Sequence, residues 1–215
     1  MRKAFMEFEV VVVGAGTAGL TCAGELRRAG MAPVVVEKSR GVGGRCATRR
    51  VEGQSVDHGT VFLHGAHSDF LAALDSVDAE VLEGWPSRVD GTGTPCQPEA
   101  FHSNERRLAF VEGVNSFPKR LARELDLRLH SRVISLRIEK NHFHLFIEGG
   151  ERFSTRRLVL ALPVEQTLGL LDSLLPYVRE LAATRTLLEM MRSLPCLTLL
   201  GGYPLNVREP DWDVS

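Results

Sequence analysis

The sequence has few cysteines, no excess of one charge and no long apolar run. Its four cysteines form no Cys-x-x-Cys pair and do not combine with histidine at metal-ligand spacing, so neither a zinc site nor a redox dithiol is predicted. The 26 Lys and Arg residues and the 27 Asp and Glu residues leave a net charge of -1, so the chain as a whole has no positive field that would attract nucleic acid or an anionic membrane. The longest apolar run, residues 10–20, is too short to span a bilayer and contains three glycines.

The N-terminus does not have the pattern of a signal peptide. Basic residues at positions 2 and 3 precede an apolar stretch, but Glu7 and Glu9 interrupt this stretch and no small-residue cleavage site follows. We therefore expect a cytoplasmic protein in a reducing compartment, with no membrane or nucleic-acid partner. Hydrophobic residues at 44% and charged residues at 25% are ordinary globular usage, which excludes disorder, collagen and coiled coil.

A β-α-β unit is predicted at the start of the chain. Residues 8–13 and 33–37 are nearly continuous β-branched runs, typical of strands buried on both faces of a parallel sheet. Small and apolar residues recur between them at helical spacing, and Gly30 stands where that helix would end. The expected fold class is therefore α/β, with a doubly wound, Rossmann-like domain.

The rest of the chain alternates between helical and strand patterns. Apolar spacing predicts a helix over 66–84, a loop over 89–99 and a helix from Asn115 or Ser116 to about 124. Two antiparallel strands are expected over 127–138 and 142–147, and a short buried strand over 158–162, before Pro163. Helices on both sides of Pro176 are expected over 164–192, and a last strand over 196–200.

A Gly-x-Gly-x-x-Gly motif follows the first strand and opens the first helix. Gly14 permits a tight turn, Gly16 lets a pyrophosphate approach the backbone, and Gly19 allows close packing of helix on strand. The helix N-terminus at Thr17 and Ala18 offers unpaired N–H groups to phosphate. Glu37 closes the second strand, where a carboxylate accepts hydrogen bonds from an adenosine ribose and would repel the 2′-phosphate of NADP.

Gly43-Gly44-Arg45 follows Glu37 after a short path. The two glycines allow a second close backbone approach, and the arginine can form a charge-assisted hydrogen bond with phosphate. A glycine-rich turn, a strand-end glutamate and Gly-Gly-Arg in this order resemble the FAD-binding domain of flavin amine oxidases, phytoene desaturases and protoporphyrinogen oxidases. Within that group the sequence is most similar to the renalase-type NAD(P)/FAD-dependent oxidoreductases.

Four later segments extend this resemblance. Residues 57–62 resemble the family's segment beside the flavin ring, and residues 110–119 resemble the segment that returns from the substrate domain. Residues 132–133 resemble the strand that meets the adenine, and residues 160–163 resemble the strand end near the flavin. The resemblance implies FAD as the cofactor. The expected cofactor-binding residues are Gly14, Gly16, Thr17, Ala18, Gly19, Glu37, Lys38, Gly43, Gly44, Arg45, Gly59, Thr60, Val61, Phe62, Val133 and Pro163.

The sequence departs from the family's pattern at two points. Thr60-Val61 stands where the family has Ala-Gln, and the family's last segment, a Gly-Asp followed by a helix pointing at the flavin, does not occur before Ser215. We therefore expect a C-terminally truncated member that binds FAD weakly. An incomplete small domain would leave apolar surface uncovered near 194–200 and favour self-association.

The expected organisation is a discontinuous FAD-binding domain, residues 1–65 and 109–165, with a partial substrate domain, residues 66–108 and 166–215. The resemblance implies hydride transfer from a reduced nicotinamide isomer or an amine to the flavin, with O2 as acceptor and H2O2 as product. Two alternatives remain open: a desaturase-like flavoenzyme, and a non-catalytic fragment that binds FAD or another nucleotide.

No side chain is assigned a catalytic role, and no metal site is expected. His142 and His144 share one face of a predicted strand, a pattern more typical of a half-buried strand face than of a metal pair. His64 and His67 are interpreted as loop histidines. Cys46 is interpreted as a small buried thiol.

Overall fold

The computed structural model describes residues 4–86, 105–202 and 206–207. Contacts within the chain divide it into two units, the first formed by residues 1–44 and 121–196 and the second by residues 45–120 and 197–215. The chain leaves the first unit after the second glycine-rich turn and returns to it within a short helix. Each unit is described by itself below.

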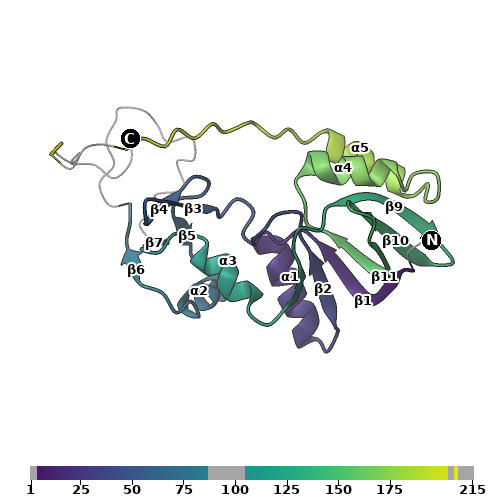
Figure 1. The fold of residues 1–215 in the computed structure, drawn as a ribbon, viewed down its shortest axis with the longest axis horizontal. Coiled ribbons are helices and arrows are strands. Elements are labelled where there is room, and N and C mark those ends of the chain that lie inside the picture. Colours follow the sequence, from purple (N-terminus) through teal and green to yellow (C-terminus); the bar gives the residue numbers. More distant parts are fainter. Residues whose placement is uncertain (1–3, 87–104, 203–205, 208–215) are drawn as a thin grey trace. The chain divides into compact units, whose positions relative to one another are not determined.

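A six-stranded mixed sheet forms the centre of the first unit (Figure 1). Its strand order is β8-β2-β1-β11-β10-β9; β8, β2, β1 and β11 pair in parallel, while β10 is antiparallel to both of its neighbours. The parallel pairing of β1 with β2 and β11 gives the α/β architecture that the sequence predicts. The strands are β1 Met6–Val13, β2 Pro33–Val36, β8 Asp126–Arg128, β9 Val133–Glu139, β10 His142–Ile147 and β11 Arg152–Leu160.

Helices cover both faces of this sheet because its central strands are apolar on both sides. Val12 and Val35 pack against α1 (Thr17–Arg28) through Leu20 and Ala23. Val11 and the other alternate valines pack on the opposite face, against residues of α4 (Val164–Asp172) and α5 (Leu181–Glu189). Figure 1 shows α1 and the α4–α5 pair on different sides of the strands. The β-branched runs therefore form strands that are buried on both faces, as the sequence predicts.

The second unit contains two small antiparallel sheets and two short helices. One sheet is the hairpin β3-β4, and the other has the order β5-β7-β6. A hydrogen-bonding side chain begins one of the helices: His67 Nδ1 accepts from the Asp69 N–H at 3.3 Å. The elements are β3 Thr48–Val51, β4 Gln54–Asp57, β5 Leu63–Gly65, α2 Ser68–Asp75, β6 Val81–Glu83, β7 Arg106–Phe110 and α3 Ser116–Ala122.

Two predicted elements are shorter than expected. The helix over 66–84 ends at Asp75, where Ser76 Oγ donates to the Ala73 carbonyl, and residues 81–83 instead form β6 on β7. The single strand over 127–138 is wrong, because the chain turns at His130 (φ 54°) and divides the segment into β8 and β9. These two strands lie at opposite edges of the sheet, a placement that alternation along the chain does not specify.

The strand predicted over 196–200 is also wrong. This segment has no strand assignment in the part of the chain that the structure describes, and Leu197 and Leu199 are 96% and 95% exposed. Strand propensity alone does not form a strand without a neighbour to pair with. The helices on both sides of Pro176 are confirmed as α4 and α5, whereas the loop over 89–99 lies outside the described residues.

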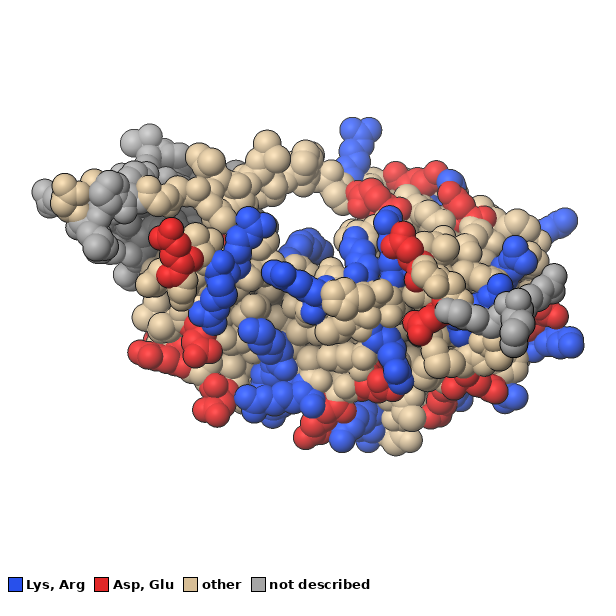
Figure 2. Space-filling model, viewed as in Figure 1, with Lys and Arg blue, Asp and Glu red and all other residues tan. Residues whose placement is uncertain are grey.

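Charges of both signs are interspersed over the face of the molecule shown in Figure 2, as a net charge of -1 implies. Among the described residues, no helix combines the length and the apolar character needed to cross a membrane.

Candidate functional site

The carboxyl ends of three parallel strands meet in the first unit, at the edge where open α/β sheets bind ligands. The Gly14 N–H donates to the Val36 carbonyl at 2.8 Å, and the Ala161 N–H donates to the Val13 carbonyl at 2.8 Å. The segments that follow β1, β2 and β11 are therefore held side by side by backbone hydrogen bonds. All three segments were predicted from the sequence to contribute to one site.

The first glycine-rich turn leaves no space for side chains on its inner side. Gly14 has φ 107°, and a Cβ there would lie 2.4 Å from the Ala161 carbonyl oxygen. A Cβ on Gly19 would lie 2.0 Å from the Gly14 carbonyl oxygen. Contacts below 3 Å do not occur for real Cβ atoms, so both positions require glycine for the turn to pack on helix α1 and on the end of β11.

Gly16 is different, because a Cβ at this position would meet nothing within 4 Å. It is the N-cap residue of α1, no side chain caps the helix there, and the first turn of the helix has no acidic residue. The N–H groups of Thr17, Ala18 and Gly19 have no acceptor within the helix. Space at Gly16, free N–H donors and the positive end of the helix dipole together suit a phosphate group.

The carboxylate of Glu37 is held next to this turn. Its Oε2 accepts from the Ala15 N–H and its Oε1 accepts from the Ser39 N–H, both at 2.8 Å. Each carboxylate oxygen has two lone pairs, so each can accept a further hydrogen bond from a ribose hydroxyl. The two backbone bonds orient the carboxylate, and the remaining lone pairs match a diol.

The second glycine-rich turn lies against the first. The Gly43 N–H donates to the Ala15 carbonyl at 2.8 Å, and Gly43 forms a parallel bridge with Gly16. A Cβ on Gly44 would lie 3.3 Å from the Gly16 Cα. The structure therefore brings the two glycine motifs into direct backbone contact, as the hypothesis of a shared pyrophosphate site requires.

Three further predicted residues lie at the ends of elements of the first unit. Lys38 Nζ donates to Gln166 Oε1 of α4 at 3.0 Å, and Pro163 is the N-cap residue of α4. Val133 begins β9, two residues after Ser131, whose N–H donates to the Glu37 carbonyl at 2.8 Å. Val133 and Pro163 thus follow segments that are hydrogen-bonded to the ends of β2 and β1.

The predicted residues Arg45, Gly59, Thr60, Val61 and Phe62 belong to the second unit. The Thr60 N–H donates to the Arg45 carbonyl at 3.0 Å, and a Cβ on Gly59 would lie 2.1 Å from that oxygen. Within this unit, therefore, the residue after the second glycine turn contacts the segment that resembles the family's flavin-side segment. Phe62 has an edge-on contact with Trp85, their ring centroids 6.0 Å apart.

Asp57 is a residue whose role the sequence reasoning did not identify. Its carboxylate accepts from Thr48 Oγ1 at 2.5 Å and from the Val114 N–H at 2.9 Å, and Thr48 Oγ1 also accepts from the Asn115 N–H at 3.2 Å. Asp57 therefore connects the β3-β4 hairpin to the segment that follows β7. Only the tertiary pairing of segments distant in the sequence reveals this role.

The interpretation of Cys46 as a small buried thiol agrees with its surroundings. It is 6% exposed, and burial raises the pKa of its thiol; a hydrogen bond with Thr60 acts in the opposite direction, and the charge of Asp57 adds to the rise. A protonated thiol is a poor nucleophile and a poor metal ligand. No group of three His, Cys, Asp or Glu side chains in the described ranges is arranged to hold a metal ion.

The four histidines considered in the sequence lie next to other residues of the fold, not in a metal site of the described part of the chain. His64 Nδ1 lies 2.7 Å from Glu105 Oε2 in the second unit, and His67 caps α2. His142 and His144 lie on one face of β10, while Leu145 and Ile147 are buried on the other, as alternation predicts.

Two family models match this chain. The NAD(P)-binding Rossmann-like domain matches residues 12–76, and the flavin-containing amine oxidoreductase model matches residues 96–193. The first match covers both glycine-rich turns and Glu37. The second covers α3, β8–β11 and the two helices that follow.

Individual relatives agree with these models. Pseudooxynicotine dehydrogenase of a Pseudomonas species is 37% identical over 78 residues, and putrescine oxidase of Kocuria rosea is 36% identical over 78 residues. Each alignment covers 36% of this chain and 16% of the relative. A solved structure of a putrescine oxidase variant superposes with a TM-score of 0.65 at 15% identity, over 85% of this chain and 64% of that one.

The comparisons confirm the α/β, Rossmann-like fold class and indicate FAD as the cofactor. The glycine turns, the open space at Gly16 and the oriented carboxylate of Glu37 fit the adenosine and pyrophosphate part of FAD. The aligned part of the chain spans about a sixth of the length of the two relatives.

Proposed function

We propose that this chain acts in an FAD-dependent oxidoreductase that removes a hydride from a small amine. The proposal starts from its FAD-binding fold, which is that of the flavin-containing amine oxidase superfamily. An amine is the substrate class named for putrescine oxidase, with which residues of this chain align. A reduced nicotinamide isomer, the substrate expected for a renalase-type member, is the alternative substrate of the same site.

The residues of the first unit have binding and positioning roles in this proposal. The N–H groups at the start of α1 bind the pyrophosphate, and Glu37 holds the adenosine ribose through the lone pairs that its two backbone bonds leave free. Gly16 and Gly43–Gly44 keep side chains away from the phosphates. Arg45, the first residue of the second unit, is proposed to donate a charge-assisted hydrogen bond to phosphate.

When bound, FAD would supply the hydride acceptor for cleavage of a substrate C–H bond, with O2 as the final electron acceptor and H2O2 as the product. The protein then contributes orientation and electrostatics. Gly59, Thr60, Val61 and Phe62 are proposed to contact the flavin. Val61 cannot donate the side-chain amide hydrogen bond that a glutamine would provide at this position.

The observation that carries the proposal is the backbone contact between Gly16 and Gly43 beside the fixed carboxylate of Glu37. A single glycine-rich turn suits any dinucleotide, whereas a second turn placed on the first suits a cofactor whose pyrophosphate is approached from two sides. This arrangement lies within one unit of the structure.

The first test is titration of the purified chain with FAD, followed by flavin fluorescence and by absorbance between 350 and 500 nm. Arg45→Ala should weaken FAD by about 1.5–3 kcal/mol, roughly tenfold to a hundredfold. Glu37→Gln should weaken FAD as well, because the amide NH2 cannot accept from a ribose hydroxyl or a backbone N–H. Arg123→Gln, an exposed arginine of the first unit, is the matched control.

The second test asks which substrate reduces the bound flavin. Under anaerobic conditions, putrescine should bleach the absorbance near 450 nm, and readmitted O2 should restore it with formation of H2O2. Bleaching by a dihydro-nicotinamide but not by amines would assign the renalase-type reaction. Unchanged FAD affinity in Arg45→Ala and Glu37→Gln would remove both residues from the site.

A second candidate function, nucleotide binding without turnover, is favoured by one observation. The family model that matches residues 12–76, which contain both glycine-rich turns and Glu37, is described as an NAD(P)-binding Rossmann-like domain, a description of binding and not of a reaction. FAD binding that depends on Glu37, without bleaching by any donor tested, would support this candidate.

A further inference from the structure

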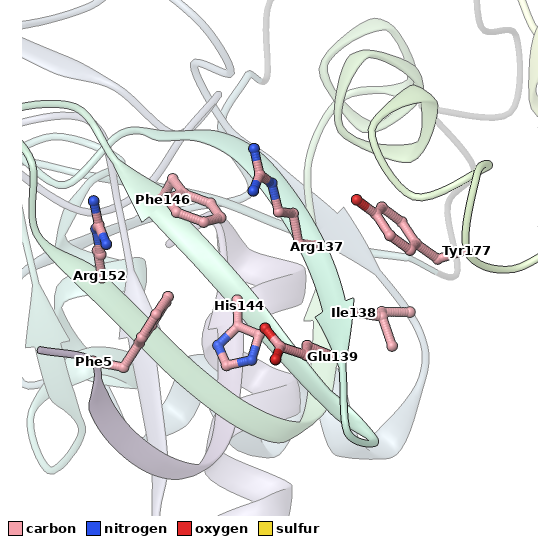
Figure 3. A pocket seen from close by; sticks show the side chains of 8 residues that line it. All are labelled: Phe5, Arg137, Ile138, Glu139, His144, Phe146, Arg152 and Tyr177. Carbon is pink, nitrogen blue, oxygen red and sulfur yellow. The ribbon is translucent and has the colours of Figure 1, made fainter. Parts of the chain in front are cut away.

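A cavity of about 580 Å³ lies on the antiparallel part of the six-stranded sheet, and it shares no lining residue with the site described above. Strands β9, β10 and β11, the residues before β1 and the segment between α4 and α5 contribute to it. Its volume is typical of a site for a small molecule. The lining residues are Phe5, Arg137, Ile138, Glu139, His144, Phe146, Arg152 and Tyr177 (Figure 3).

Two guanidinium groups flank one aromatic ring in this cavity. The Arg137 Cζ lies 5.3 Å from the centroid of the Phe146 ring, and the Arg152 Cζ lies 5.6 Å from the same centroid. Arg152 is also 5.8 Å from the Phe5 ring. Figure 3 shows Phe146 between the two arginines. Stacking on the rings fixes the planes of the guanidinium groups and leaves their N–H edges available.

Neither arginine has a carboxylate partner among the described residues. The one acidic residue of the cavity, Glu139, lies two residues from Arg137 on the same face of β9, although the two side chains form no ion pair. Strand register separates Glu139 from Arg152, because Glu139 pairs with His142 on β10 whereas Arg152 pairs with Phe146. The cavity therefore has a cationic, aromatic end. The two guanidinium groups carry like charges, and an anion that contacts both beside the Phe146 ring would reduce their repulsion.

His144 adds an aromatic ring to the same wall. Its ring lies 4.4 Å from the Phe5 ring, centroid to centroid, and its Nδ1 is buried without a hydrogen-bond partner. This nitrogen is not accessible from the cavity, so the contribution of His144 to the wall is its ring, which packs against Phe5. Tyr177 and Ile138 complete an apolar opposite end.

We propose that this cavity binds a small anion with a planar apolar body, of the class of aromatic carboxylates. Arg137 and Arg152 donate hydrogen bonds to the carboxylate, and the planar body packs against the rings of Phe5, Phe146 and Tyr177. The site is independent of FAD, because no lining residue belongs to the glycine-rich turns or to Glu37.

The experiment is calorimetric titration of the full chain with 1-naphthoate, and with 1-naphthol as a neutral probe of the same ring system. Wild-type protein should bind 1-naphthoate at least tenfold more tightly than 1-naphthol. Arg137→Gln combined with Arg152→Gln should remove this preference, whereas Arg123→Gln, the exposed control, should retain it. Saturation with FAD should leave the naphthoate affinity unchanged, which separates this site from the proposed function.

Equal affinity for the two probes, or unchanged naphthoate binding in the double variant, would overturn the proposal. Backbone amide chemical shifts of the wild-type chain give a second measurement if the double variant does not fold. Shifts induced by naphthoate at His144 and Phe146 would support the site, and shifts confined to other residues would refute it.

Discussion

Gly19 and Gly24 lie in the same helix and differ in what a methyl group would contact. A Cβ on Gly19 would lie 2.0 Å from the Gly14 carbonyl oxygen, whereas a Cβ on Gly24 would meet nothing within 4 Å. The helical pattern alone does not separate these two glycines. Their difference arises from the turn that precedes the helix, which only Gly19 approaches closely.

We predict that Gly19→Ala destabilises the chain and weakens FAD, because the turn must move to relieve the contact. Gly24→Ala should stabilise α1 by about 0.5–1 kcal/mol, since glycine in a helix costs backbone entropy. Urea unfolding and FAD titration of both variants check the prediction. Equal stability of the two variants would contradict the close approach at Gly19.

The thiol of Cys46 gives a pH-dependent prediction. Burial raises its pKa, so the folded chain keeps the proton at pH values where an unfolded chain, with a pKa of about 8.5, has lost it. The contribution of this group to stability is therefore fully present below about pH 8.5 and falls as the pH rises further.

Alkylation with iodoacetamide, followed by peptide mass mapping, measures this effect. At pH 8, Cys196 should react quickly because it is exposed, and Cys46 should react slowly because it is buried and protonated. Labelling of Cys46 at the rate of Cys196 would show that the thiol is accessible. A Cys46→Ser variant identifies the peptide.

At the scale of elements, alternation predicted the faces of strands better than their extents. The pattern over 127–138 continues through the turn at His130, so no change in periodicity marks the division into β8 and β9. The hydrogen bond from the Ser131 N–H to the Glu37 carbonyl stabilises this turn. Pairing with β2, which is distant in the sequence, decides where β8 lies, and the hairpin with β10 decides where β9 lies.

Helix α4 covers one face of the sheet, and its Leu171 is 6% exposed within the core that includes Phe153 and Leu145. Leu171→Ala should destabilise the chain by about 2–5 kcal/mol, the cost of a cavity in a packed core. Leu187→Ala in α5 is the matched control, because this side chain is 66% exposed and its removal should cost little. Thermal and urea unfolding compare the two variants.

At the scale of the whole molecule, exposed leucines follow α5. Leu194, Leu197 and Leu199 are 89%, 96% and 95% exposed, and Met190 is 76% exposed. A contiguous apolar segment of this kind is an association site in water. The segment that was predicted as a strand is therefore the part of the chain that we expect to mediate self-association.

We predict that the purified chain is in concentration-dependent equilibrium with oligomers. Replacing Leu194, Leu197 and Leu199 by serine should shift this equilibrium to monomer without lowering the unfolding temperature, since these side chains contribute little to the core. Sedimentation velocity at several concentrations measures the change. Ala182→Ser, on the exposed side of α5, is the control substitution.

The sequence by itself determined the α/β class, the first β-α-β unit, the two glycine-rich turns and Glu37. These features are local: valine runs, glycines at turns and a strand-end acid need only their neighbours along the chain to be interpreted. The domain boundaries, the cofactor-contacting roles of individual residues and the substrate remain predictions.

Only the tertiary structure decided how separate segments meet. The contact between Gly16 and Gly43, the orientation of Glu37 by Ala15 and Ser39, and the role of Asp57 all depend on backbone groups from different segments. The cavity of Arg137 and Arg152 likewise needs Phe5 and Tyr177, which are distant in the sequence from the three consecutive strands β9, β10 and β11. Such contacts are set by sheet register and by backbone hydrogen bonds between distant residues, and no local pattern in the sequence encodes their geometry.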